Sequence, residues 1–215
     1  MSEDLEKAHE RMIVEQLQRR GIADRRVLAA MRTVPRHRFV PVELADQAYD
    51  DNPLPIGESQ TISQPYMVAL ICEAATLTGS EKVLEVGTGS GYQAAVLSRL
   101  AAEVYSIECI EQLCNRARQV LQNVGITNVH LRLGDGSFGW PEEAPFDVIV
   151  VTAAMPCVPA MLLGQLKPEG RLIAPIGEQE LQTLVSIRRV KGHWQEEYFG
   201  ECRFVRMTGR YGFTD

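Results

Sequence analysis

Apolar residues recur at three- and four-residue spacing near the start of the chain. This spacing predicts an amphipathic helix over residues 5–20, and Gly21 is a suitable stop. Asp24 is a suitable N-cap for a second helix, Arg25–Arg32, which Pro35 ends. The sequence therefore predicts a helical N-terminal segment.

Further along the chain, apolar strand-like runs alternate with helical patterns. The predicted strands are Lys82–Val86, Glu103–Ile107, Val129–Leu133, Phe146–Val151 and Arg171–Pro175. The predicted helices are Tyr66–Ala75, Tyr92–Leu100, Glu111–Val124 and Val158–Leu166. Such alternation predicts βαβ units, and hence a doubly wound, mostly parallel α/β sheet of the Rossmann-like type. Two longer strands at the end of the chain, Gln182–Val190 and Trp194–Val205, predict an antiparallel edge.

The stretch Val34–Pro65 separates the helical start from the alternating region. It contains five prolines and is far longer than the usual connection of about 4–6 residues. Loops of this length often act as lids or binding segments. We therefore expect residues 1–65 to form N-terminal helices and a Pro-rich lid, packed on a Rossmann-like core of residues 66–215 in one globular domain.

Composition and charge narrow the function classes. The chain has 215 residues with 22 basic and 28 acidic side chains, and the net charge of −6 argues against non-specific nucleic-acid binding. No apolar run approaches the length of a membrane span, and the first residues are acidic where a signal peptide would be basic. We expect a cytoplasmic monomer with no nucleic-acid or membrane partner.

The cysteines and histidines do not suggest a metal centre or a disulfide framework. Five cysteines are scattered without a C-x-x-C pair, and the four histidines are dispersed without the spacing of zinc ligands. We expect reduced thiols and no metal site.

The candidate chemistry lies in the glycine-rich turn Gly87–Gly91, directly after the strand 82–86. Ligands of doubly wound sheets bind at the carboxyl ends of the strands, and glycines let the backbone approach them closely. The spacing is G-x-G-x-G, with Tyr92 where a dinucleotide fingerprint has its last glycine. Glu85 before the turn disfavours a pyrophosphate and suits a cationic ligand, while Glu108 can accept hydrogen bonds from ribose hydroxyls. Together these features favour S-adenosylmethionine over NAD.

Another acidic residue, Asp135, follows the predicted strand Val129–Leu133 and is flanked by Gly134 and Gly136. Asp135 can accept a hydrogen bond from an adenine amino group while the backbone N–H of Gly136 meets a ring nitrogen. A simple Asx turn is the alternative interpretation of the same residues.

Several segments resemble the protein-L-isoaspartate (D-aspartate) O-methyltransferase family. The most specific is T-I-S-Q-P at Thr61–Pro65, ahead of a methyltransferase glycine turn. Further matching segments cover nearly the whole chain: residues 27–36, 39–41, 53–57, 85–92, 134–136, 146–154 and 203–205.

The resemblance implies a methyltransferase of S-adenosylmethionine-dependent, Rossmann-like type. Such an enzyme methylates the free α-carboxylate of L-isoaspartyl residues in damaged proteins and peptides, with D-aspartyl residues as a further substrate class, and starts repair through a succinimide. The match assigns Ser63 as the active-site serine. It places the cofactor, with S-adenosylhomocysteine as its product, against the following residues: Gln60, Thr61, Ile62, Ser63, Glu85, Gly87, Gly89, Glu108, Asp135, Gly136 and Thr208.

Two positions depart from the family's pattern. Ser59 stands where bacterial members usually have glycine, and Arg206-Met207 replaces Pro-Leu before Thr208.

Other functions remain open from the residues alone. A nucleic-acid amino methyltransferase lacks support because Val151–Ala154 stands where an N-P-P-Y-like tetrad would lie. A small-molecule O-methyltransferase, a non-catalytic S-adenosylmethionine-binding protein and an NAD dehydrogenase are the remaining alternatives. Ser63 itself has two interpretations, a substrate-positioning hydroxyl or a cap of the helix that begins near Pro65.

Overall fold

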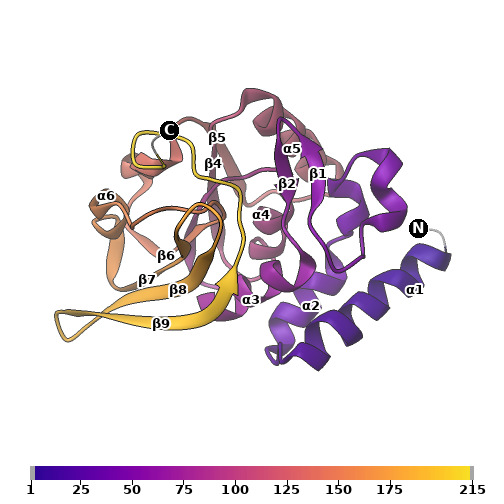
Figure 1. Ribbon diagram of the computed structural model, residues 1–215, viewed down its shortest axis with the longest axis horizontal. Coiled ribbons are helices and arrows are strands. Elements are labelled where there is room, and N and C mark those ends of the chain that lie inside the picture. The colour runs from indigo at the N-terminus through magenta and orange to yellow at the C-terminus, as the bar shows by residue number, and fades with distance from the viewer. Residues whose placement is uncertain (1–2, 214–215) are drawn as a thin grey trace.

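A twisted seven-stranded sheet runs through the part of the molecule that the computed structural model describes, residues 3–213, in the order β5-β4-β3-β6-β7-β8-β9 (Figure 1). Its strands are β3 (Lys82–Val86), β4 (Glu103–Glu108), β5 (Val129–Leu133), β6 (Phe146–Val151), β7 (Leu166–Gly177), β8 (Gln182–Val190) and β9 (His193–Cys202). The helices are α1 (Glu3–Arg11), α2 (Arg25–Thr33), α3 (Pro65–Ala75), α4 (Tyr92–Leu97), α5 (Glu111–Asn123) and α6 (Ala160–Leu163). This arrangement confirms the predicted fold class.

The strand order places β3 at the point where the chain changes direction across the sheet. β3 pairs in parallel with both β4 and β6, and β5 and β7 extend the parallel part on either side. β8 and β9 pair antiparallel, as predicted for the C-terminal edge. The carboxyl end of β3 therefore lies at a topological switch point, where sheets of this type bind ligands.

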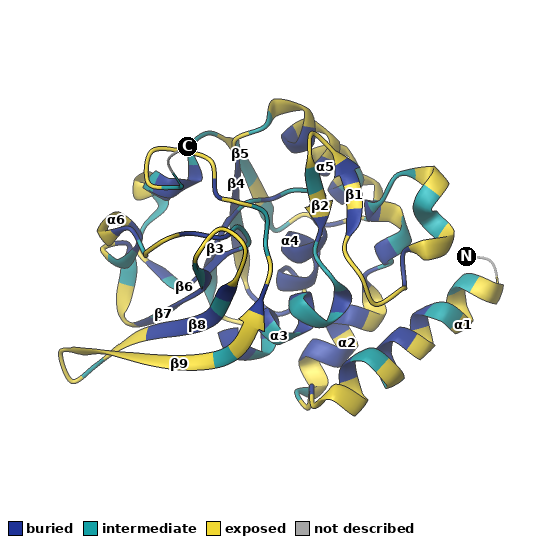
Figure 2. Ribbon diagram, in the orientation of Figure 1, coloured by how far each residue is buried: buried dark blue, intermediate teal, exposed yellow. Residues whose placement is uncertain are grey.

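Alternation along the strands divides the core into two hydrophobic clusters. On β6, Val148 and Val150 pack toward a cluster that contains side chains of α2, α3, α4 and α5. Ile149 and Val151 point to the other face, where they pack with Leu162 of α6. Figure 2 shows the buried strands between these layers, with exposed residues on the outer helix faces and along β9.

The N-terminal segment joins the first cluster. The predicted helix over residues 5–20 is continuous helical structure, with a π-helical part at Met12–Leu17 and a left-handed Gly21 at its end. Asp24 caps α2, because its side chain accepts a hydrogen bond from the Arg26 N–H at 2.7 Å. Met12 and Leu17 are fully buried in the same cluster as Val83 of β3. Apolar side chains from both sides of residue 65 thus share one core. The division of the chain at residue 65 stays a prediction.

The Pro-rich stretch contains more local structure than the sequence indicates. Two 3-10 helices, Arg36–Phe39 and Val42–Gln47, precede a two-stranded antiparallel sheet of β1 (Leu54–Gly57) and β2 (Gln60–Ile62). Alternating prolines and polar residues hide this pairing, because Pro55 interrupts the usual strand pattern.

Four predicted elements had wrong boundaries. The helix predicted over Val158–Leu166 is the short α6, and β7 begins at Leu166 rather than at Arg171. Leu166 pairs with Phe146, and residues 167–170 bulge from the strand before Arg171 pairs with Val148. The helix predicted to reach Leu100 ends at Leu97, and the following N–H groups of Arg99 and Leu100 donate to carbonyls three residues back. The strand predicted to reach Val205 ends at Cys202.

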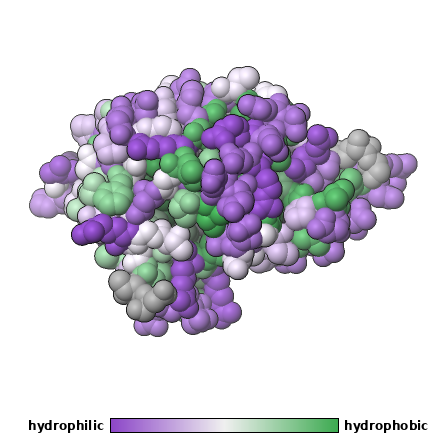
Figure 3. Space-filling view, turned by 90° about the horizontal axis from the view of Figure 1, so that it is seen from above, coloured by the Kyte–Doolittle hydropathy of each residue, from purple (hydrophilic) through white to green (hydrophobic). Residues whose placement is uncertain are grey.

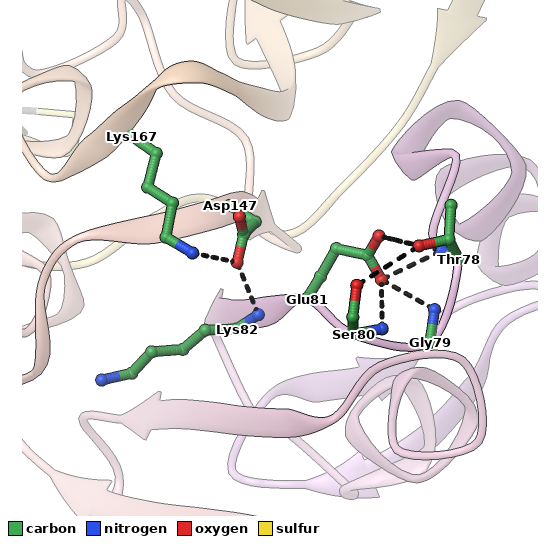
Figure 4. A network of polar contacts seen from close by, with 7 residues as sticks. All are labelled: Thr78, Gly79, Ser80, Glu81, Lys82, Asp147 and Lys167. Atoms are coloured by element: carbon green, nitrogen blue, oxygen red, sulfur yellow. Dashed lines mark hydrogen bonds and ion pairs between the residues drawn. The ribbon is translucent and has the colours of Figure 1, made fainter.

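Polar contacts fix the amino-terminal edge of the sheet (Figure 4). The Glu81 carboxylate accepts hydrogen bonds from the backbone N–H groups of Thr78, Gly79 and Ser80, and so holds the turn before β3. Partial burial opposes the charge of Glu81, yet these donors hold its pKa below the ordinary value. Asp147 at the start of β6 accepts from the Lys82 N–H at 2.8 Å and pairs with Lys167 Nζ at 2.8 Å.

The outer surface is mostly hydrophilic in the view from above, with apolar atoms in narrow bands between polar ones (Figure 3). Among the described residues, no helix has the length and apolar character needed to cross a membrane.

A buried polar cluster anchors the N-terminal segment. The His9 ring stacks on Tyr49 with 4.6 Å between centroids, and His37 Nδ1 lies 2.8 Å from the Tyr49 hydroxyl. Arg36 is fully buried beside them, donates from Nε to Ala48 O at 2.7 Å and lies over the Tyr92 ring. Burial lowers the pKa of Arg36 to about 10, so the guanidinium remains charged at neutral pH.

This cluster predicts an acid-sensitive stability. Burial lowers the pKa values of His9 and His37 below the ordinary 6.5, so the fold favours the neutral rings. The unfolded chain then binds more protons as the pH falls below about 6.5, and the free energy of unfolding declines. We expect Tm to drop between pH 7.5 and 5.5, and to drop less in His9→Gln/His37→Gln. The control is His193→Gln at the exposed start of β9, which should keep the wild-type drop; an equal drop in all three proteins would contradict the prediction.

Candidate active site

A cavity opens at the carboxyl ends of β3, β4 and β6. All but two of the residues predicted to contact a cofactor line it: Gln60, Thr61, Ile62, Ser63, Gly87, Gly89, Glu108, Gly136 and Thr208. The two exceptions are Glu85 and Asp135. The sequence therefore located the cavity, while the individual contacts stay predictions.

The turn after β3 is shaped by a close approach to β6. Thr152 follows β6, and its hydroxyl donates to Gly87 O at 2.5 Å. Gly87 has a φ of +99°, and a Cβ built there would lie 2.5 Å from Thr152 Oγ1. Glycine is thus required at position 87 by the neighbouring strand end, and not only by a ligand as the sequence suggested.

Glu108 closes the same turn from the side of β4. Its Oε2 accepts from the Gly89 N–H at 2.7 Å, and its Oε1 accepts from the Ile110 N–H at 3.0 Å. The side chain is 5% exposed and lines the cavity. The Cys109 thiol also donates to Oε1 at 3.6 Å, whereas Oε2 has a further lone pair that can accept from a ligand's hydroxyl group.

Glu85 lies behind the turn rather than on the cavity wall. Strand alternation places Glu85 on the same face as Val83, the face that packs against α2, α3, α4 and α5. Its register partner on β4 is Ser106. The Ser106 hydroxyl donates to Glu85 Oε2, while Oε1 has no hydrogen-bond partner among the described residues. Burial raises the pKa of Glu85 to about 8, so the group is mostly neutral at pH 7. A cofactor contact of Glu85 stays a prediction, and the charge assumed for it from the sequence is not that of this buried group.

Asp135 forms an Asx turn, which is the alternative interpretation that the sequence left open. Its Oδ1 accepts from the Ser137 N–H at 2.9 Å, and its Oδ2 accepts from the Arg210 N–H at 2.9 Å. Burial opposes the charge, but these bonds hold the pKa of Asp135 below its ordinary value. Asp135 thereby ties the C-terminal segment to the short 3-10 helix Gly136–Phe138, and Gly136 and Ser137 reach the cavity in its place.

The β1–β2 sheet brings Ser63 to the rim of the cavity. Its turn places Glu58 and Ser59 at φ values of 53° and 56°, the left-handed region that favours glycine, which gives a physical reason for the family's usual glycine at position 59. The N-cap of α3 is Gln64, not Ser63, so the capping interpretation of Ser63 was wrong. The half-buried Ser63 side chain makes no hydrogen bond within residues 3–213 and faces the cavity.

Sequence reasoning assigned Thr208 to the cavity from the family resemblance but missed its neighbours Val205, Arg206 and Met207, which also line it. Val205 O accepts from the Ala154 N–H, and the Met207 N–H donates to Ala154 O, each at 2.8 Å. This pairing after β6 carries Arg206 and Thr208 to the rim, where the Thr208 hydroxyl lies 3.2 Å from Cys109 Sγ. No local pattern signals such a contact, because the partners are about 50 residues apart in sequence.

Among the described residues, no group of three or more histidine, cysteine, aspartate or glutamate side chains is arranged to hold a metal ion.

Comparisons with known proteins agree with this geometry. Residues 7–212 match the family model for protein-L-isoaspartate (D-aspartate) O-methyltransferase. The chain belongs to this family. The protein-L-isoaspartate O-methyltransferase of Syntrophus aciditrophicus is 51% identical over 217 residues and covers 100% of both chains. Protein-L-isoaspartate O-methyltransferase 2 of Geotalea uraniireducens is 53% identical, covering 98% of each.

Solved structures of the family share the fold. One protein-L-isoaspartate O-methyltransferase superposes with a TM-score of 0.84 at 32% identity, covering 95% of this chain and 67% of the other. A Plasmodium falciparum protein described as a protein-L-isoaspartate O-methyltransferase, in complex with S-adenosyl-L-homocysteine, gives a TM-score of 0.79 at 26% identity over 93% of this chain and 98% of the other.

The contact between positions 87 and 152 predicts a measurable coupling. Gly87→Ala should destabilise the fold by about 1–3 kcal/mol more than Gly125→Ala, because Gly125 also has a positive φ but nothing within 4 Å of its Cβ position. Thr152→Ala should recover part of this loss in the Gly87→Ala background, since it removes the clashing hydroxyl. Urea unfolding of the four proteins of this double-mutant cycle measures the coupling; strictly additive effects would contradict it.

Proposed function

We propose that this protein transfers a methyl group from S-adenosylmethionine to the free α-carboxylate of L-isoaspartyl residues in damaged proteins and peptides. The observation that carries the proposal is the cavity at the switch point, which has Glu108 on one side of the glycine turn and the unpaired hydroxyl of Ser63 at its rim. Family membership over residues 7–212 supports the same activity.

The donor set of the cavity fits S-adenosylmethionine better than a dinucleotide. The Gly89 N–H already donates to Glu108, so the turn presents a carboxylate where a pyrophosphate would need free amides. Glu108 Oε2 has a lone pair left for a ribose hydroxyl, and Ile107 and Ile110 offer apolar surface for an adenine ring. We infer that Glu108, the Gly87–Gly89 backbone, Gly136 and the 60–63 segment hold the cofactor, with Thr208 at the rim. When bound, S-adenosylmethionine supplies a methyl group on a positively charged sulfur.

The residues that line the cavity have to position the substrate carboxylate, and they do not have to remove a proton from it. A substrate carboxylate with a pKa near 4 is already ionised at pH 7 and needs no general base. None of the residues that line the cavity is a histidine. We infer that the Ser63 hydroxyl donates to the substrate carboxylate and fixes its direction of approach.

The Pro-rich stretch supplies the cover in this proposal. Gln60, Thr61 and Ile62 lie on the cavity wall, and β1 packs behind them with Leu54 and Ile56 buried in the core. A wall of this kind keeps water from the reacting groups and strengthens local electrostatic interactions. The monomeric state and cytoplasmic location stay predictions.

The activity is tested with two peptides that differ only in the linkage of one residue. We expect methyl label from S-adenosylmethionine to enter an L-isoaspartyl peptide and not the matching aspartyl peptide, because only the former presents a free α-carboxylate. Equal labelling of both, or label in neither, would reject the proposed substrate.

Ser63→Ala separates positioning from binding. We expect kcat/KM on the isoaspartyl peptide to fall about 100-fold, because the carboxylate loses its orienting donor. Cofactor affinity and Tm should stay close to wild type, since Ser63 neither caps α3 nor bonds to the protein. Glu108→Ala is the contrasting variant, with cofactor affinity weakened about tenfold or more by calorimetry. A fully active Ser63→Ala enzyme would remove Ser63 from the catalytic residues.

A further inference from the structure

A second groove adjoins the candidate active site. The two share Thr61, Ser63 and Val205, so the groove is continuous with the rim where Ser63 lies. One wall is the start of α3, with Tyr66 and Met67, and the opposite wall is the final part of β9 with the residues that follow it. A polypeptide that places a carboxylate at Ser63 can leave the site along this groove.

The groove leads to an open edge of the sheet. β9 is the last strand in the order and pairs with β8 alone among the described residues. Residues 193–198 are exposed on both faces of the strand, and in Figure 1 the β8–β9 hairpin projects from the body of the molecule. Backbone N–H and C=O groups along such an edge accept an added extended strand readily.

The exposed part of β9 carries two glutamates and no lysine or arginine. Glu196 and Glu197 are exposed in mid-strand, and Glu201 lies at the groove. The Tyr198 hydroxyl donates to Glu196, and Arg171 on β7 interacts electrostatically with Glu197. Two strands of this sequence paired across a twofold axis would bring these glutamates together, which disfavours a second copy as the occupant.

We propose that the outer edge of β9 docks the polypeptide that flanks the isoaspartyl residue as an added strand, and that Glu196 and Glu197 favour flanking segments with lysine or arginine. The proposal rests on the proposed function, because the isoaspartyl residue sets the starting point at Ser63. β9 is irregular at Phe199 and Gly200, where its register with β8 shifts and Gly200 has a φ of 106°. At about 3.4 Å per residue, Glu197 therefore lies at most about 10 Å from Gly200 in the groove. The charge preference therefore applies to substrate residues about four to six positions from the isoaspartyl residue.

Charge reversal tests the side-chain part of this proposal. The test uses two series of isoaspartyl peptides. Each peptide carries either two lysines or two glutamates about five residues from the isoaspartyl residue, on its N-terminal side in one series and on its C-terminal side in the other. We expect the wild-type KM to be about fivefold lower for the lysine peptide in one of the two series, and this ratio to invert in Glu196→Lys/Glu197→Lys. The matched control Glu43→Lys/Asp46→Lys changes the net charge equally, at exposed residues of the 3-10 helix Val42–Gln47, and should keep the wild-type ratio.

Backbone methylation tests the strand pairing separately. N-methyl groups at alternate flanking positions remove the N–H groups that face β9, and should raise KM, whereas methyl groups at the positions between should not.

The outcomes separate the docking proposal from the proposed function. Wild-type protein that methylates none of these peptides rejects the function itself. Methylation that ignores flanking charge in both series, or a preference that survives in Glu196→Lys/Glu197→Lys, overturns the docking proposal. A wild-type dimer in sedimentation that this variant strengthens assigns the edge to a second copy and overturns it as well.

Discussion

The site depends on how tightly the turn after β3 is held between its two neighbouring strand ends. On one side, Gly87 O accepts a hydrogen bond from the Thr152 hydroxyl, and this hydroxyl lies so close that residue 87 has no room for a Cβ. On the other, the Gly87 N–H donates to Ile107 O at 2.9 Å and the Gly89 N–H donates to Glu108. The turn is therefore fixed by strands that are themselves fixed by the sheet. A ligand meets a surface that is formed in advance, which lowers the ordering cost of binding.

The hydrogen bonds that hold this turn also affect which ligands suit the site. Many nucleotide-binding turns offer free backbone amides to phosphate groups, and here a carboxylate takes the Gly89 amide. Glu85 behind the turn adds no fixed charge while it is buried and protonated. We therefore infer that the selection against phosphate comes from Glu108, one of the three acids that the sequence singled out.

The sequence could predict those features that depend on local pattern. The five parallel strands and the glycine turn follow from apolar runs and glycine spacing, and the position of Glu108 follows from its place after β4. The failures are non-local: Leu166 extends β7 because Phe146 pairs with it, and Arg206 reaches the rim because residues 205–207 pair with Ala154. Glu85 was misjudged because a linear motif does not show that Ser106 and the helix layer enclose it.

The burial of the N-terminal segment has a consequence for synthesis of the chain. Met12, Leu17, Val27 and Met31 pack against elements from α3 onward, including β3 and α4, which lie later in the sequence. As the ribosome releases the chain from its N-terminus, these apolar side chains emerge before the surfaces that cover them. The first third of the chain is thus an exposed nascent segment until about residue 100 is made, a state in which chaperones protect growing chains from aggregation.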